Sequence, residues 1–204
     1  MFLTERDVFT WGPSSDMKYK TRSYPLFSAC GLNCGLCPRH HSSGTSRCPG
    51  CAGEWFSSVH PSCGILSCCN LKDIEYCFLC NEYPCKKYNG ADLNDSFISH
   101  KNQVLDLERA KQIGMNGYET ELSQKVKVLK YLLSNHDDGR RKSFFCTAVN
   151  LMTLNDLNTG MELINSEVKK DDSVKTKALI AVRIFENMAE IKGISLKLRK
   201  GNKA

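Results

Sequence analysis

The chain has 204 residues, a formal net charge of +6 and 12 cysteines. This length gives room for one medium domain or two small ones. The sequence contains no run of about 18 apolar residues, the length needed to cross a bilayer, so a transmembrane segment is not expected. Glu5, Arg6 and Asp7 interrupt the place where a secretory signal needs an apolar run, so we expect a cytoplasmic protein whose thiols stay reduced.

Residues 1–29 are predicted to form an N-terminal extension that packs loosely on the body of the protein. The segment is polar and mixed, and Trp11-Gly12-Pro13 is a turn signal. Phe2, Phe9 and Trp11 are the side chains that could anchor it.

Residues 30–90 are predicted to form a small, loop-rich, multi-cysteine metal-binding core. Eleven of the cysteines lie in this stretch, and only Cys146 lies outside it. Three pairs have the spacing Cys-x-x-Cys: Cys34 with Cys37, Cys48 with Cys51, and Cys77 with Cys80. A tight turn of this length directs two thiolates at one metal ion. The second pair encloses Pro49 and Gly50, which combine a fixed φ with a residue that tolerates positive φ.

Disulfide bonds, structural zinc and an iron–sulfur cluster compete as explanations of these cysteines. Disulfides are typical of small secreted domains and conflict with the expected reducing compartment. Zinc agrees best with the spacing, because tetrahedral thiolate sites are usually built from two Cys-x-x-Cys pairs. The pairs that begin at Cys34 and Cys48 suit a first zinc ion. Five further cysteines are candidates for a second: Cys63, Cys68, Cys77, Cys80 and Cys85. A different assignment, in which Cys30 or Cys85 replaces one of these ligands, is equally compatible with the spacing.

The alternative cofactor is an iron–sulfur cluster. Cys30, Cys34 and Cys37 have the spacing that binds a four-iron cluster with one open iron in radical enzymes that use S-adenosylmethionine. Those enzymes place the triplet after the first strand of a barrel of alternating strands and helices, and no such alternation follows here. Because thiolates suit both zinc and iron–sulfur centres, the spacing by itself leaves both metals open. His40, His41 and His60 could replace a thiolate, but with so many cysteines we expect them to be surface histidines.

Four cysteine motifs follow one another in a recognisable order. They are CGLNCGLCP from Cys30, CPGC from Cys48, CGILSC from Cys63 and CFLCNEYPC from Cys77. Together they resemble a prokaryotic family of cysteine-rich proteins of unknown function that is generally presumed to bind zinc. The resemblance covers residues 29–88, and it implies metal binding without an established reaction or substrate. Ten cysteines match its pattern and are the expected metal ligands: Cys30, Cys34, Cys37, Cys48, Cys51, Cys63, Cys68, Cys77, Cys80 and Cys85. Cys69 and Cys146 fall outside the pattern.

Residues 91–204 are predicted to form a mainly α-helical bundle with a basic tail. The apolar spacing predicts helices over 96–113, 122–135, 144–154 and 174–191. Gly114 is the expected stop of the first, and Asp171-Asp172-Ser173 is the expected N-terminus of the last. Amphipathic helices must hide their apolar stripes on one another, so a bundle beside or against the metal core is expected. Cys146 lies within one stripe, which favours a buried core residue over a nucleophile.

Charge and motifs restrict the function. A zinc ion held by four thiolates carries a net charge of −2, so two such sites would lower the formal +6 to about +2. This counts against a strong nucleic-acid interface and leaves the basic tail after Glu190 as the segment that could touch phosphates. The sequence contains no Gly-rich phosphate loop, metalloprotease motif or nucleophile elbow, and whether the protein is an enzyme stays open.

The expected function is therefore that of a metal-binding protein, a zinc-stabilised binding or adaptor module holding two ions. Its partner is an unknown protein or small molecule, and no membrane is involved. The alternative is an iron–sulfur-cluster or thiol-dependent enzyme that uses Cys30, Cys34 and Cys37.

Overall fold

The computed structural model describes residues 19–91 and 93–200, and within these ranges the secondary structure is helical, without a strand. The α-helices are α1 (Phe56–Val59), α2 (Gly64–Leu71), α3 (Gln103–Ile113), α4 (Met115–Asn135), α5 (Lys142–Leu151), α6 (Leu154–Glu167) and α7 (Val174–Ile191). Short 3-10 helices span Cys34–Leu36, Gly44–Ser46, Cys77–Leu79 and Lys86–Tyr88. The predicted anchors Phe2, Phe9 and Trp11 lie outside the described residues.

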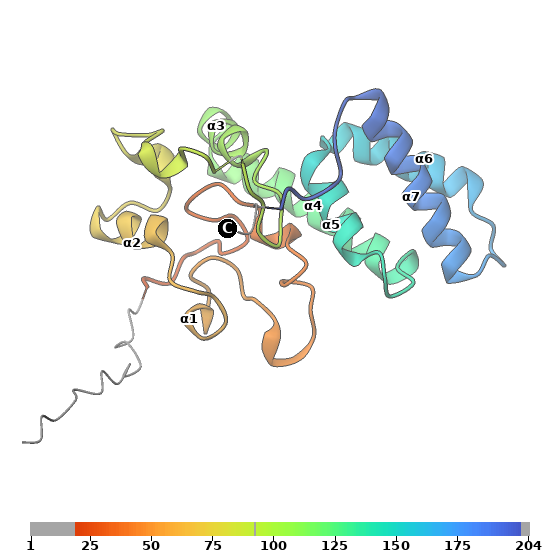
Figure 1. The fold of residues 1–204 in the computed structure, drawn as a ribbon, viewed down its shortest axis with the longest axis horizontal. Helices are drawn as coiled ribbons and strands as arrows, with labels where there is room; N and C mark the ends of the chain where they lie inside the picture. Colours follow the sequence, from red (N-terminus) through yellow and green to blue (C-terminus); the bar gives the residue numbers. More distant parts are fainter. Residues whose placement is uncertain (1–18, 92, 201–204) are drawn as a thin grey trace, which may run out of the picture.

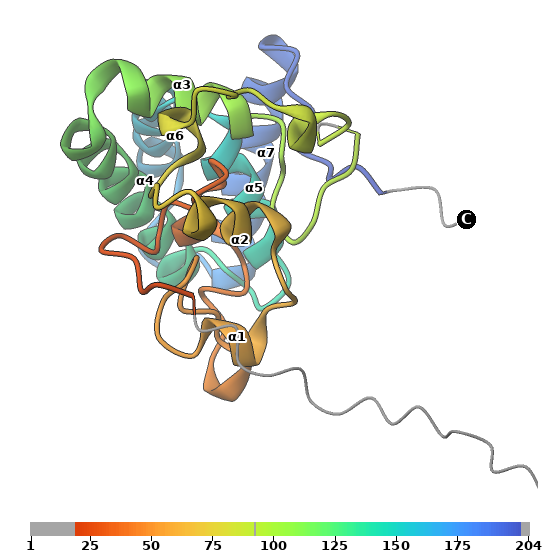
Figure 2. The same ribbon diagram turned by 90° about the vertical axis from the view of Figure 1, so that its left-hand side faces the viewer.

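The molecule has a loop-rich half and a helical half. Figure 1 shows the loops that carry α1 and α2 on one side and α6 and α7 on the far side, with α3 to α5 between them. The turned view in Figure 2 keeps α1 and α2 together, in front of the longer helices. Among the described residues, no helix is both long and apolar enough to cross a membrane. The expected combination of a loop-rich cysteine region with a helical bundle is therefore found.

One hydrophobic core joins the two halves. Phe27 and Leu36 come from the loops and are fully buried in the same cluster as Leu129, Phe145 and Phe185 from the helices. A smaller cluster lies within the loop-rich half and contains Ala29, Cys48, Cys51, Ala52, Phe56, Leu66 and Cys69. Because the larger cluster takes side chains from both halves, removing apolar surface from either half will destabilise the other.

Most of the predicted helices are confirmed, and their ends follow local capping. α4 ends at Asn135 and α7 spans the predicted residues, with the Ser173 hydroxyl accepting the Thr176 N–H at 3.1 Å. α3 ends at Ile113, where Gly114 has a φ of +75°. It begins at Gln103, later than predicted, because the Asp95 carboxylate accepts the His100 N–H at 2.8 Å and holds the preceding residues in a loop.

The single helix predicted over 144–154 is wrong, because the structure divides this stretch between α5 and α6. Met152 is extended, and Thr153 begins α6 with a capping box. The Thr153 hydroxyl accepts the Asp156 N–H at 3.2 Å, and the Asp156 carboxylate accepts the Thr153 N–H at 3.3 Å. Both helices bury their apolar residues in one core, so the apolar pattern continues across the break. The Thr-x-x-Asp sequence was the signal that could have revealed it.

The basic tail is held against the body up to Arg199. The Arg199 guanidinium donates to Asp95 at 2.7 Å, and the two residues also exchange backbone contacts: the Arg199 N–H donates to the Asp95 carboxylate at 2.7 Å and the Asp95 N–H to the Arg199 carbonyl at 2.9 Å. The Asp95 side chain is fully buried in this contact. The arginine lowers the pKa of that carboxyl well below its usual range, against the effect of burial.

Candidate metal centre

Two Cys-x-x-Cys pairs are built on short 3-10 turns, as their spacing predicted. The Cys37 N–H donates to the Cys34 carbonyl at 3.1 Å, and the Cys80 N–H donates to the Cys77 carbonyl at 2.9 Å. Each turn is thereby closed by its own backbone, with a cysteine at each end. The geometry agrees with the knuckles that commonly hold a thiophilic metal.

The third pair is held in place by the segment that precedes the cysteines. The Cys51 N–H donates to the Pro25 carbonyl at 2.8 Å. Gly50 has a φ of +101°, and a Cβ at this position would lie 2.3 Å from the same carbonyl oxygen. Only glycine therefore allows this approach, which fixes the pair Cys48 and Cys51 beside residue 25.

A first group of thiols gathers around Cys34. Burial raises the pKa of Cys34 well above its usual value, and the nearby thiols of Cys51, Cys30, Cys37 and Cys48 raise it further. Burial likewise raises the pKa of Cys51 to about 12, with a further contribution from Cys30. Deprotonated sulfur in this group would therefore need a cation beside it, and a bound dication supplies that charge.

Backbone N–H groups oppose the effect of burial at several thiols of this group, Cys37 among them. Burial raises the pKa of Cys37, and the N–H groups of Arg39 and His40 oppose this effect by hydrogen bonding to the sulfur. Donors of this kind favour the thiolate over the thiol. The pKa of Cys37 is still raised overall, so these donors offset only part of the effect of burial.

A second group of thiols lines one small cavity of about 80 Å³ next to α2. Its cysteines are Cys68, Cys69, Cys77, Cys80 and Cys85. The Cys69 and Cys77 sulfurs lie 3.6 Å apart. Their hydrogen bond lowers the pKa of Cys77 and raises that of Cys69. The Lys72 ammonium lies 3.3 Å from the Cys80 sulfur and adds positive charge at the edge of the cavity.

The donors fit a thiophilic metal by their chemistry but do not surround one. All of the cysteines carry free thiols. Within residues 19–91 and 93–200, no group of three or more His, Cys, Asp or Glu side chains has an arrangement that could hold a metal ion. Soft thiolates are the donors that zinc and iron–sulfur centres prefer. Metal binding would therefore require the sulfurs of each group to move closer together.

The cysteines that the sequence predicted as ligands divide between the two groups of thiols, with one difference from the expected division. Cys63 was expected beside Cys68, but its thiol contributes instead to the electrostatic surroundings of Cys30 and Cys51. Cys69 was placed outside the family pattern and is nonetheless buried against Cys77. The spacing gave no signal for Cys69, because only the fold of α2 decides which of two adjacent cysteines turns inward.

The histidines and Cys146 have structural surroundings. A ring nitrogen of His40 contacts the Cys48 carbonyl at 2.9 Å, and one of His41 contacts the Gly35 carbonyl at 2.8 Å. Both rings are half-buried and thus brace the loops rather than lie free on the surface. Cys146 is buried in the helical core, as predicted, and burial raises the pKa of its thiol to about 12.

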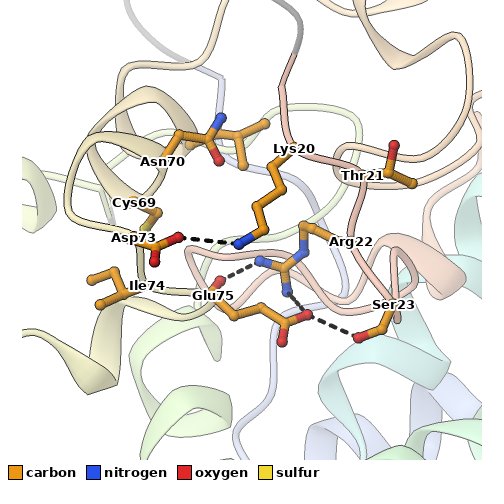
Figure 3. Close-up of a pocket in the computed structure, with 10 residues that line it drawn as sticks. Lys20, Thr21, Arg22, Ser23, Cys69, Asn70, Asp73, Ile74 and Glu75 are labelled. Atoms are coloured by element: carbon orange, nitrogen blue, oxygen red, sulfur yellow. Dashed lines mark hydrogen bonds and ion pairs between the residues drawn. The ribbon is translucent and has the colours of Figure 1, made fainter.

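A buried arginine lies beside the second group. Figure 3 shows a pocket of about 330 Å³ in which Arg22 and Lys20 approach Glu75 and Asp73, with Cys69 in the wall. Arg22 is 8% exposed and donates to the Glu75 carbonyl and, at 3.1 Å, to the Phe27 carbonyl. Its guanidinium also lies 4.4 Å from the centre of the Tyr76 ring. The positive charge of Arg22 favours the thiolate at Cys69 and at Cys77.

The comparison with protein families matches the part of the chain in which both groups of thiols lie. A family model described as "Protein of unknown function (DUF3795)" matches residues 26–90. This stretch contains every cysteine except Cys146 and thus both groups of thiols. The chain is similar to a cysteine-rich, uncharacterised family over this region. No curated protein and no solved structure matches the chain.

Proposed function

We propose that the chain is a zinc-binding protein in which thiolates between Cys30 and Cys85 hold two zinc ions and stabilise a binding or adaptor surface. The observation that carries this proposal is the gathering of eleven free thiols into two groups, the first with two Cys-x-x-Cys pairs and the second with one. When bound, zinc supplies positive charge to the thiolates and a crosslink between distant segments.

The first ion is assigned to the group around Cys34. Its ligands would be the two pairs that sequence spacing selected: Cys34 with Cys37, and Cys48 with Cys51. Support comes from the mutual electrostatic influence of these thiols and from the N–H groups aimed at Cys37. Cys30 and Cys63 lie close enough to affect Cys51 and are the alternates for this site.

The second ion is assigned to the cavity beside α2. Bonds of about 2.3 Å at tetrahedral angles separate two zinc-bound sulfurs by about 3.8 Å. The 3.6 Å between the Cys69 and Cys77 sulfurs is close to that separation. Cys80 belongs to the same turn as Cys77, and Cys85 lines the same cavity. We therefore assign Cys69, Cys77, Cys80 and Cys85 to this site, with Cys68 as the alternate ligand.

A structural metal also accounts for the composition of the loop-rich half. Its two α-helices span Phe56–Val59 and Gly64–Leu71, and its own apolar cluster consists largely of alanine and cysteine with few large side chains. A core of this size contributes little burial free energy, whereas metal binding to the folded form adds its own. Saturated thiolate sites leave no open coordination position, which favours a binding module over a catalytic centre.

Metal analysis of the full chain, purified without oxygen, tests the proposal. We expect about two equivalents of zinc per chain and a colourless protein. Iron and acid-labile sulfide with absorption in the visible range would overturn it and support the iron–sulfur enzyme instead. A metal-free, folded protein would contradict both functions.

Two variants distinguish the loss of a zinc ligand from a non-specific effect of replacing a cysteine. Cys34→Ser removes a ligand of the first site and is expected to lower the zinc content by about one equivalent. Cys146→Ala is the matched control, because its buried thiol lies in α5, outside both groups. The control is expected to retain both ions, and an equal loss of zinc from the two variants would count against the assignment.

A further inference from the structure

Arginine and aromatic side chains from distant parts of the chain meet on the surface of the loop-rich half, and none of them is a proposed zinc ligand. The Arg39 guanidinium lies 4.9 Å from the centre of the Phe97 ring. The Arg39 carbonyl accepts the Cys48 N–H at 3.0 Å, which brings Arg47, the residue before Cys48, into the same region. The Trp55 indole N–H donates to the Arg47 carbonyl at 3.4 Å. These contacts connect two arginines and two aromatic residues into one continuous surface.

Both aromatic rings of this surface are open to solvent. Trp55 is 51% exposed and Phe97 is 55% exposed. Trp55 has a φ of +54°, in the left-handed region that bulky side chains rarely adopt. An exposed ring offers a flat apolar face on which a nucleic-acid base can stack, whatever the identity of that base.

Further positive charge reaches this region from α4 and α5. Burial lowers the pKa of His40, and the positive charges of Arg47 and of Lys130 in α4 lower it further. Burial also lowers the pKa of His41, where Lys130 and Lys142 of α5 act in the same direction. The two histidine rings lie 5.3 Å apart, so these cations surround one small area.

The positive charges of this surface are not consumed by ion pairs. The ion pairs of residues 19–91 and 93–200 include none of the four side chains that supply this charge: Arg39, Arg47, Lys130 and Lys142. Glu54, next to Trp55, carries the opposite charge. The first zinc site would add a charge of −2 beneath the surface, and Arg39 favours the thiolate at Cys37. The two arginines offset that charge, and the lysines keep the surface positive.

The basic tail ends beside the same surface. Arg199 is bound to Asp95, two residues before Phe97 in the chain. Lys200 follows directly and is exposed. The segment that the sequence selected for contact with phosphates is therefore held near an exposed aromatic ring.

We propose that single-stranded nucleic acid binds to the surface formed by Arg39, Arg47, Trp55, Phe97, Lys130 and Lys142. Unpaired bases would stack on Trp55 and Phe97, and the phosphates would contact the arginines and lysines. The bases of a duplex are stacked on one another, so exposed rings favour a single strand. The inference rests on the proposed function, because it names the partner of the binding surface and because zinc would stabilise the loops that carry three of these residues.

Fluorescence anisotropy with labelled oligouridylate and oligodeoxythymidylate, each of about a dozen nucleotides, tests this surface. The protein is the full chain, and its zinc content is measured first. We expect saturable binding that weakens by about tenfold when the salt concentration rises about fourfold, the effect of about two or three phosphate contacts. The strand that binds tighter identifies the sugar.

The failure of this proposal can be distinguished from that of the zinc proposal. Zinc-loaded protein that binds neither strand, or that binds a duplex of the same length equally well, would overturn the nucleic-acid surface and leave the zinc assignment intact. Metal-free protein that binds a single strand would support the surface and contradict the zinc assignment. Metal-free protein that binds neither strand would refute both.

Variants of single residues locate the binding surface. Trp55→Ala is expected to weaken binding by at least about fivefold, the effect of losing one stacked base. Its control is Leu163→Ala, which shortens an exposed side chain of α6 on the far side of the molecule (Figure 1) and should leave binding unchanged. If Trp55→Ala loses zinc, Phe97→Ala, outside the cysteine loops, takes its place.

Lys130→Gln tests the contribution of charge outside the cysteine loops. We expect it to weaken binding and to reduce the dependence on salt by the share of about one phosphate. Lys175→Gln removes the same charge from an exposed position of α7 and is expected to change neither property. Unchanged binding in Lys130→Gln, or in an aromatic variant that keeps its zinc, would refute the surface.

Discussion

The Cys69 sulfur lies 3.6 Å from the Cys77 sulfur, although the residues come from α2 and from a separate 3-10 turn. The Cys69 side chain is nearly fully buried, whereas that of its neighbour Cys68 is half-buried. Consecutive residues on a helix point about 100° apart, so the two thiols reach the cavity in different directions, and it is Cys69 that contacts Cys77. The contact therefore selects Cys69 as the inward-facing thiol of the pair.

Replacement of either cysteine tests this selection. Cys69→Ser is expected to reduce the zinc content by about one equivalent, or to release that ion first to a competing chelator, because a metal-sulfur bond is lost. Cys68→Ser is the matched neighbour and is expected to hold two ions. Zinc content and the rate of release to a colorimetric chelator measure both. The opposite result would show that Cys68 is the ligand, as the family pattern implies.

Oxidation after metal removal provides a second, independent test of the same contact. Once the metal is chelated, oxidised glutathione is expected to convert the Cys69 and Cys77 thiols into a disulfide, releasing two molecules of reduced glutathione. Only a small movement is needed, since a disulfide joins sulfurs about 2 Å apart. Peptide mapping by mass spectrometry locates the bond. A predominant Cys77–Cys80 crosslink would speak against the contact, and zinc-loaded protein should resist oxidation.

The apolar pattern of the sequence predicted the helical half well, and its failures have local causes. α4 and α7 each bury one continuous stripe, so their periodicity is visible in the sequence. The division between α5 and α6 was missed because Met152 and Leu157 enter the same core on either side of the break. Capping chemistry at Thr153, rather than hydrophobicity, decides where α6 begins.

The candidate sites were only partly visible in the sequence. Cys-x-x-Cys spacing identifies a turn and therefore predicted the local pairs. Which pairs meet depends on contacts between distant segments, such as that of Cys51 with Pro25, and no spacing rule reports these. The surroundings of Lys125 were not predictable either, because an isolated lysine in a helical pattern is usually exposed. Its burial follows from the packing of α4 against four other elements: α3, α5, α6 and the 3-10 helix Cys34–Leu36.

Asn33 links the cysteine loops to the helices, and its removal should destabilise both. The side chain is 1% exposed. It donates to Asp106 at 2.8 Å and to Asn150 at 3.3 Å, and it accepts the Tyr118 hydroxyl at 2.9 Å. Asn33→Ala leaves these buried groups unmatched and is expected to lower the free energy of unfolding by about 2–4 kcal/mol.

Chemical denaturation of zinc-saturated protein measures the effect of Asn33→Ala. Asn165→Ala, at an exposed position of α6, is the control and is expected to change stability by less than about 0.5 kcal/mol. A similar small effect for Asn33→Ala would mean that the network does not hold the two halves together.

Asp106 should make stability depend on pH in a way that the sequence would not suggest. Burial raises the pKa of this carboxyl to about 7, although Lys125, the nearby Tyr118 hydroxyl and the hydrogen bond from Asn33 oppose the shift. The native protein therefore holds a proton that the unfolded chain releases near pH 4. Its stabilising contribution is complete below that pH and is lost as the pH rises toward 7, by up to about 1.4 kcal/mol per pH unit.

Asp106→Asn removes this titration and keeps an oxygen to accept the Asn33 amide. The stability of the wild-type protein relative to this variant is expected to fall between pH 5 and about pH 7 and to become constant above about pH 8. Urea unfolding of both proteins with saturating zinc gives the difference at each pH, so that metal loss, which affects both alike, cancels. A difference that stays constant from pH 5 to 8 would show that the carboxyl titrates near its usual value. A rise confined to the range below about pH 5 would instead indicate a carboxylate stabilised by its neighbours, with Lys125 close enough to outweigh the burial.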